Sequence, residues 1–126
     1  MTPVIPLLFC AVLGLLAVFQ LLLIAGLPLG RFAWGGRNAV LPGRLRIGSA
    51  VSVLVYAVFA GVALERAGLI AIMPSPFVGV VAMWVVAAYL MLSVLPNLAS
   101  KSTQERRVMV PVSVVLAGLA FVIALG

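Results

Sequence analysis

The sequence predicts an all-α, polytopic membrane protein: a single domain, residues 1–126, folded as a four-transmembrane-helix bundle. The first observation is composition. A chain of 126 residues that is 66% hydrophobic, with a mean hydropathy of +1.39, holds more apolar surface than a soluble domain of that size can bury. The second is length, because each of four apolar runs has 18 residues or more, against the roughly 20 that cross about 30 Å of hydrocarbon. The runs are Val4–Leu29, Ile47–Ala67, Phe77–Leu95 and Val108–Leu125.

The third observation is the uneven charge of the loops. Loop one, Gly30–Arg46, holds four of the eight basic residues, and loop three, Asn97–Arg107, holds three more, whereas the second loop has only Arg66. Loops one and three lie on the same side of a four-span chain, and the positive-inside rule places that side in the cytoplasm. We therefore expect an N-out, C-out orientation in the plasma membrane.

The first run is expected to be retained as a helix. It lacks the positive n-region and the small-residue cleavage site of a signal peptide. Residues 27–31, Leu-Pro-Leu-Gly-Arg, are typical of a helix end. Gln20 is its polar residue at depth, and a buried amide of this kind more often bonds a neighbouring helix than a ligand. Cys10 is expected to act as a small buried hydrophobe.

Loop one is the least generic stretch of the chain. Phe32 and Trp34 suit the headgroup region, where aromatic rings are half solvated. Gly35-Gly36 and Pro42-Gly43 indicate turns, so the loop folds back on itself. Two interpretations stay open: an anchored connector, or a cap over the cytoplasmic mouth of the bundle.

The second helix is rich in small residues, which let helix backbones approach closely. At its far end Glu65 and Arg66 are expected at the outer interface, and the sequence leaves open whether Glu65 faces the bundle or the headgroups. The third helix is expected to kink or stop at Pro96. Residues 102–105, Ser-Thr-Gln-Glu, fit a capping box, which predicts that the fourth helix begins near Thr103 and that Glu105 bonds back to the Ser102 amide.

Five polar residues in the cytoplasmic half of three different helices predict a polar mouth. Polar side chains at that depth avoid lipid and converge on the bundle interior. Loop one would form the roof of this cavity, with Trp34 at its rim. A simpler alternative is that the polar groups bond one another and leave no space. The residues are Gln20, Ser49, Ser52, Ser93 and Asn97.

Four arginines near the starts of the second and fourth helices predict a site for anionic headgroups or an anionic ligand. The positive ends of the helix dipoles add to their field. Arg46 is the one expected to face inward, and Trp34 would lie beside the cluster. The net charge of +6 is read as membrane orientation and lipid attraction, with no nucleic-acid binding. The arginines are Arg44, Arg46, Arg106 and Arg107.

The side-chain inventory leaves little for catalysis. The chain has no histidine and no aspartate, and its only side-chain carboxylates are Glu65 and Glu105. Metal sites built on histidine, haem ligation by histidine and Ser-His-Asp hydrolysis all need residues that it lacks. We expect no cofactor, no metal and no enzymatic activity.

The segments 34–49 and 97–107 resemble those of small four-span bacterial integral membrane proteins of unknown function. The resemblance covers nearly the whole chain and implies a multi-pass protein of the bacterial inner membrane. It implies no chemistry, so no functional residue is carried over. The chain departs from the small multidrug resistance exporters, which have a glutamate within the first membrane helix.

The expected function is that of a non-enzymatic membrane protein: an accessory, lipid-associated or oligomer-forming subunit. Its expected partners are membrane lipids with anionic headgroups, and a second copy or another membrane protein. The alternative is a small transporter or channel for an anionic or apolar solute that enters from the cytoplasmic side. A third hypothesis, an enzyme acting on lipid, would have to use Glu65 or Glu105 as its carboxylate.

Overall fold

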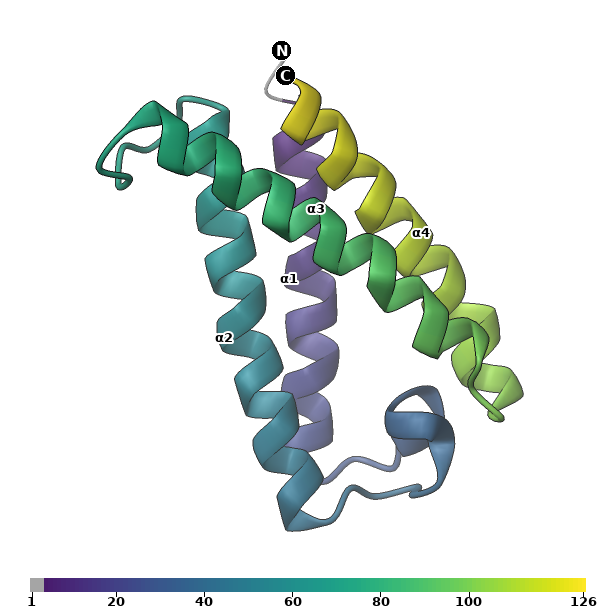
Figure 1. The fold of residues 1–126 in the computed structure, drawn as a ribbon. Helices are drawn as coiled ribbons and strands as arrows, with labels where there is room; N and C mark the ends of the chain where they lie inside the picture. The colour runs from purple at the N-terminus through teal and green to yellow at the C-terminus, as the bar shows by residue number, and fades with distance from the viewer. Residues whose placement is uncertain (1–3) are drawn as a thin grey trace.

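The computed structural model describes residues 4–126 and contains four long α-helices within that range (Figure 1). Each helix is long and apolar enough to cross a membrane, so the prediction of an all-α chain with four candidate spans is confirmed. Two short 3₁₀ turns, η1 and η2, lie in the connection between the first two helices. The elements are α1 (Val4–Ile24), η1 (Gly30–Phe32), η2 (Trp34–Gly36), α2 (Gly43–Arg66), α3 (Pro76–Leu98) and α4 (Thr103–Leu125).

The helices form two hairpins, α1 with α2 and α3 with α4 (Figure 1). The hairpins approach each other at the end where α1 begins and α4 ends, and they diverge toward the opposite end. Loop one, which spans residues 25–42 in the structure, lies at the open end between the two hairpins.

The main core contains residues from all four helices. Phe9 of α1, Met83 of α3 and Ile123 of α4 are completely buried in it. Alanines at the contacts let the backbones approach closely, which is how helices pack when lipid offers no hydrophobic driving force between them. The buried alanines of this cluster are Ala63, Ala87, Ala117, Ala120 and Ala124.

The first two helices end in the same way, at a glycine in the left-handed region. After α1, Gly26 has φ +93°, and the Leu27 amide donates to the carbonyl of Leu22 at 3.2 Å. After α2, Gly68 has φ +78°, and the Leu69 amide donates to Leu64 at 3.0 Å. Both are Schellman motifs, which satisfy the last carbonyls of a helix.

Several helix bounds differ from the predicted apolar runs. The first helix ends at Ile24 and not at Leu29, because the turn at Gly26 stops it before Pro28. The third continues past Leu95 to Leu98 with Pro96 inside its last turn, so of the two predicted alternatives, a kink or a stop at that proline, the stop does not occur. The second begins before its apolar run, at Gly43, because a helix includes its polar first turn. The fourth begins at Thr103, as the capping residues predict.

Loop one is anchored by a small core of its own. Leu23 of α1, Ala33 and Leu41 are buried together, and Leu45 of α2 packs against them. The Gly30 amide donates to the Ala39 carbonyl at 2.8 Å, which folds the loop back on itself. A side chain at Gly30 would collide with the backbone of Asn38, so glycine is required there. Loop one is therefore a packed structural unit.

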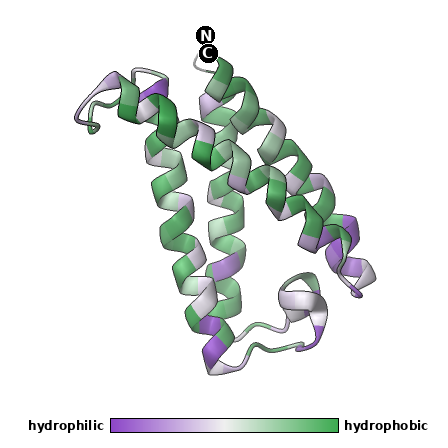
Figure 2. Cartoon of the chain, viewed as in Figure 1, coloured by the Kyte–Doolittle hydropathy of each residue, from purple (hydrophilic) through white to green (hydrophobic). Residues whose placement is uncertain are grey.

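The opposite turn, between α2 and α3, is held by Glu65. Its Oε2 accepts from the Ile72 amide at 2.6 Å, while Ser75 caps α3 by accepting from the Val78 amide at 3.4 Å. The carboxylate of Glu65 thus holds the turn between α2 and α3. Figure 2 shows hydrophilic residues near this turn and, at the other end of the molecule, in loop one and at the starts of α2 and α4.

Candidate ligand-binding cavity

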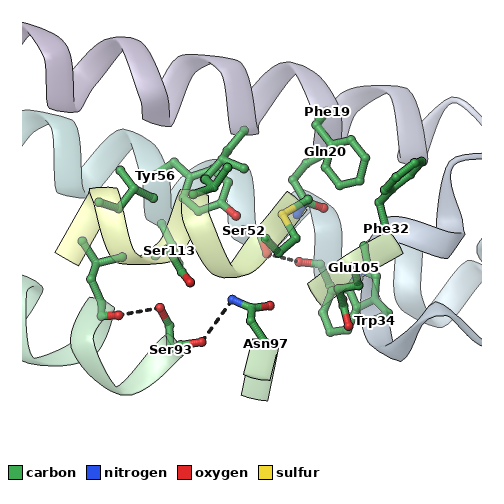
Figure 3. Close-up of a pocket in the computed structure, with 18 of the residues that line it drawn as sticks. Phe19, Gln20, Phe32, Trp34, Ser52, Tyr56, Ser93, Asn97, Glu105 and Ser113 are labelled. Atoms are coloured by element: carbon green, nitrogen blue, oxygen red, sulfur yellow. Dashed lines mark hydrogen bonds between the residues drawn. The ribbon is translucent and has the colours of Figure 1, made fainter. Parts of the chain in front are cut away.

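A cavity of about 460 Å³ lies between the two hairpins at their open end (Figure 3). All four helices and loop one contribute to its wall. Gln20, Ser52, Ser93 and Asn97, which the sequence assigns to the polar mouth, all line it. Trp34 of loop one also lines it and is 41% exposed, as expected for a residue at the rim. Whether the cavity binds a ligand stays a prediction.

Ser49 has a different place from the one expected. It is completely buried, and its Oγ accepts a hydrogen bond from the Trp34 indole Nε1 at 3.1 Å. Gly48 makes this contact possible, because an added Cβ would lie 2.7 Å from the Trp34 ring. Trp34 itself has φ +53°, which is uncommon for a residue with a side chain. Ser49 therefore positions the aromatic rim and does not line the cavity.

The hydroxyl hydrogens of the lining serines are used within the helices. Ser52 donates to the Gly48 carbonyl at 3.0 Å, Ser93 to Leu90 at 2.6 Å, and Ser113 to Val110 at 3.0 Å. A hydroxyl has one hydrogen and two lone pairs, so each serine oxygen keeps acceptor capacity only. Figure 3 shows the Ser93 and Ser113 side chains within the cavity wall.

The two amides complete the polar wall. Asn97 Nδ2 donates to the Ser93 carbonyl at 3.1 Å, which leaves its Oδ1 as an acceptor. Gln20 is only 8% exposed, and its Oε1 has no hydrogen-bond partner in the part of the chain that the structure describes. An unpaired buried oxygen costs about 1–3 kcal/mol. A ligand that donates to Gln20 would recover that free energy.

Glu105 is the one charged residue among those that line the cavity. It is 6% exposed, and its Oε2 accepts from the Gly35 amide of loop one at 3.4 Å. The predicted capping box is half correct, because Ser102 Oγ accepts from the Glu105 amide at 3.3 Å. The other half is wrong: the Ser102 amide donates to Ser100 Oγ, and the Glu105 side chain turns toward loop one. No arginine or lysine lines the cavity.

Aromatic rings form much of the remaining wall. They come from α1, loop one, α2 and α3, so they surround the polar groups from several sides. The two tyrosines were not among the predicted site residues, because a tyrosine within an apolar run is typical of ordinary packing. The rings belong to Phe19, Phe32, Trp34, Tyr56 and Tyr89.

An apolar groove of about 390 Å³ adjoins the cavity between α1 and α4. Its outer edge includes Leu15, which is 72% exposed, and Val108, which is 41% exposed, so it opens on the outer surface of the helices. Five side chains line both spaces, which are therefore separated by a single layer of side chains. The shared residues are Leu16, Phe19, Phe32, Met109 and Val112.

A second pocket adjoins the cavity on the side of the α3–α4 turn. It includes two cations, Arg37 and Lys101, and it shares Trp34, Asn97 and Glu105 with the cavity. These three side chains therefore stand between the interior and the basic surface. The cavity therefore has an apolar groove on one side and a pocket with basic and polar residues on the other.

The structure does not bring the predicted arginines together into one site. The starts of α2 and α4 lie apart, with loop one between them (Figure 1). Arg46 Nε donates to the Leu41 carbonyl at 2.9 Å, and Arg106 donates to the Ser100 carbonyl, so both hold local turns. Arg44 and Arg107 are exposed. The predicted cluster is therefore wrong, because the starts of α2 and α4, to which these arginines belong, are separated in space by loop one.

Comparisons with protein-family models, with curated proteins and with solved structures found no match. The site therefore rests on the geometry of this chain.

Proposed function

We propose that this protein is a non-enzymatic, lipid-associated membrane protein that binds an amphipathic membrane molecule between its two helical hairpins. The observation that carries the proposal is the pairing of a cavity that holds several polar groups with a wholly apolar groove, which share five wall residues. The polar end of such a molecule fits the oxygen-lined cavity, and its hydrocarbon fits the groove at the lipid face. Binding sites for small ligands combine apolar walls with a few placed polar groups in this way.

The carboxylates support a role without catalysis. Glu65 accepts from the Ile72 amide and Glu105 from the Gly35 amide, so each is engaged in holding a loop. A carboxylate that acts as a general base must lie within hydrogen-bond reach of the proton that it takes, and its pKa is tuned by burial and neighbouring groups. The inventory of the chain offers neither a histidine nor an aspartate as that partner.

The proposed setting is the bacterial inner membrane, with loop one in the cytoplasm and both termini outside. Seven basic residues in loops one and three, against one in the second loop, support this orientation. The exposed Arg44 and Arg107 then face the anionic lipid surface, each contributing about 1 kcal/mol of attraction. A reporter fused after Gly126 should be active only outside the cytoplasm, and a cytoplasmic reporter signal would contradict this orientation.

An accessory role with a partner, either a second copy or another membrane protein, is part of the proposal. The turn between α2 and α3 supports it, because Leu69 and Ile72 are 51% and 64% exposed there. Apolar side chains at the membrane surface are typical of a contact with protein or lipid. Native mass spectrometry from mild detergent would show the partner as added mass.

The cavity itself is tested by filling it. Replacing Ser52 by phenylalanine places a ring in the cavity, whereas Ser52→Ala removes the hydroxyl without filling the space. Native mass spectrometry should show a co-purifying amphiphile on the wild type and on Ser52→Ala, and none on Ser52→Phe. Equal retention by all three proteins would refute the site.

A small transporter is the second candidate, and the two-sided surroundings of the cavity favour it. Trp34, Asn97 and Glu105 separate the interior from the basic pocket, and five apolar side chains separate it from the lipid groove. Either layer could open in turn. Flux of the bound molecule across proteoliposomes, absent for Ser52→Phe, would establish transport, whereas binding without flux would exclude it.

A further inference from the structure

We propose that the cavity selects a protonated amine, so that its ligand is an alkylammonium amphiphile whose charged nitrogen faces Glu105. This inference rests on the proposed function, because it names the class of molecule that the same site takes. An amine takes the place of the anionic ligand that the sequence predicts from its arginines, because no arginine is among the residues that line the cavity.

The charge of the wall is the first argument. Glu105 is 6% exposed, and among the lining residues it is the one whose side chain carries a formal charge at pH 7. Its carboxylate has four lone-pair sites, and the Gly35 amide occupies one of them at 3.4 Å. An anion in this space would meet a like charge at low dielectric, whereas a cation would be attracted.

The hydrogen-bonding capacity of the wall is the second argument. The serine hydroxyls already donate to helix carbonyls, and Gln20 Oε1 is buried without a partner. An ammonium group has three donors and no acceptor, as the lysine side chain illustrates. It therefore matches the oxygens that the helices leave unpaired. A sulfate or a carboxylate has only acceptors and matches none of them.

The aromatic rings are the third argument. Phe19, Trp34 and Tyr56 line the space from three different elements, and the faces of such rings attract a cation by about 0.5–2 kcal/mol each when it is desolvated. The adjoining groove of about 390 Å³ is lined only by apolar side chains, so an alkyl chain completes the match. The carboxylate, the unpaired oxygens and the aromatic rings of the cavity match an amine, and the groove matches a hydrocarbon tail attached to it.

The test compares three probes of one chain length in uncharged dodecyl maltoside micelles at pH 7: dodecylammonium, dodecanol and dodecyl sulfate. Trp34 reports binding through its fluorescence in a Trp84→Phe background, because Trp84 does not line the cavity and packs edge-on against Phe121 on the outer face of the helices. Dodecylammonium should bind about ten- to a hundredfold more tightly than dodecanol, the range expected of a hydrogen-bonded charge. Dodecyl sulfate should bind more weakly than dodecanol.

The matched variant is Glu105→Gln, whose amide oxygen can still accept from Gly35. It should bring the affinities for dodecylammonium and dodecanol within about threefold of each other, since the charge-assisted bond is lost. Gln20→Leu provides a second test, and it should weaken dodecylammonium several-fold and dodecanol less, because the charged donor of an ammonium bonds an oxygen more strongly than a neutral hydroxyl does.

The outcomes separate the two proposals. Equal binding of dodecylammonium and dodecanol by the wild type, or an unchanged preference in both Glu105→Gln and Gln20→Leu, would overturn the amine selectivity and leave the lipid-binding function standing. No response of Trp34 to any of the three probes would refute the proposed function itself.

Discussion

Gly36 fastens loop one to the start of α4, and its replacement by alanine is expected to release the loop. Gly36 has φ +72°, and an added Cβ would lie 2.4 Å from Ser102 Cβ and 2.7 Å from Ser102 Oγ. Ser102 Oγ also caps α4 through the Glu105 amide and donates to the Arg31 carbonyl. A side chain at Gly36 therefore disturbs the backbone angle, the helix cap and the bond between loop and helix.

The magnitude follows from these three effects. A left-handed conformation costs a residue with a Cβ about 1–2 kcal/mol. Loss of an N-cap serine costs about 1 kcal/mol, and loss of a hydrogen bond costs about 1 kcal/mol more. We expect Gly36→Ala to favour loop opening by about 3–4 kcal/mol. Gly35→Ala is the matched control, because Gly35 has φ +79° with no atom within 4 Å of an added Cβ, so it should cost only about 1–2 kcal/mol.

Hydrogen exchange of residues 25–42, measured by mass spectrometry, reports the free energy of loop opening. A difference of about 2 kcal/mol between the two alanine variants predicts roughly thirtyfold faster exchange for Gly36→Ala than for Gly35→Ala. Ser102→Ala loses the cap and the Arg31 bond, about 2 kcal/mol together, without backbone strain, so its exchange rate should fall between those of the two glycine variants. Equal exchange rates in the two glycine variants would refute the contact between loop one and α4.

Three further predictions concern other parts of the structure. The Cβ of Gly48→Ala would lie 2.7 Å from the Trp34 ring, so this variant should displace the ring and shift its fluorescence to longer wavelength. Gly43→Ala, with no atom within 4 Å of an added Cβ, should leave the spectrum unchanged, and an unshifted Gly48→Ala spectrum would count against the Trp34 position. Glu65→Gln replaces the charged acceptor of the Ile72 amide, which lies 2.6 Å away, by a neutral one. The hydrogen of that amide should then exchange about tenfold faster, and an unchanged exchange rate would show that Glu65 does not hold the turn. Replacing the exposed Arg44 and Arg107 by glutamine should reduce co-purifying phosphatidylglycerol without changing dodecylammonium affinity, and a parallel loss of both would contradict two separate surfaces.

The sequence predicts the helices well because the membrane imposes a simple rule on composition. Apolar runs of 18 residues or more have few other structures available in lipid, so four of them give four helices. The same rule places Gln20, Ser93 and Asn97 inside the bundle, since polar groups at depth avoid lipid. The structure has these three side chains on the cavity wall.

The details that sequence reasoning missed depend on the path of loop one. Residues 102–105 fit a capping box. In the structure, however, loop one packs against Ser102 at Gly36, and the Glu105 carboxylate accepts a hydrogen bond from the Gly35 amide. Spacing along a helix determines which residues share a face, whereas the fold of a loop that crosses two hairpins depends on long-range packing. The path of loop one also separates the start of α2 from the start of α4, so the four arginines predicted to form one site lie apart.

The location of the bound amphiphile is the most direct test of the account. A dodecylammonium analogue with a photoreactive diazirine in its chain should label Phe19, Phe32 and Met109, which stand between the cavity and the groove. Peptide mapping should find this labelling lost in Ser52→Phe and kept in Ser52→Ala. Labelling confined to outward-facing residues such as Val85 and Leu92, which are 63% and 65% exposed, would contradict a site between the hairpins.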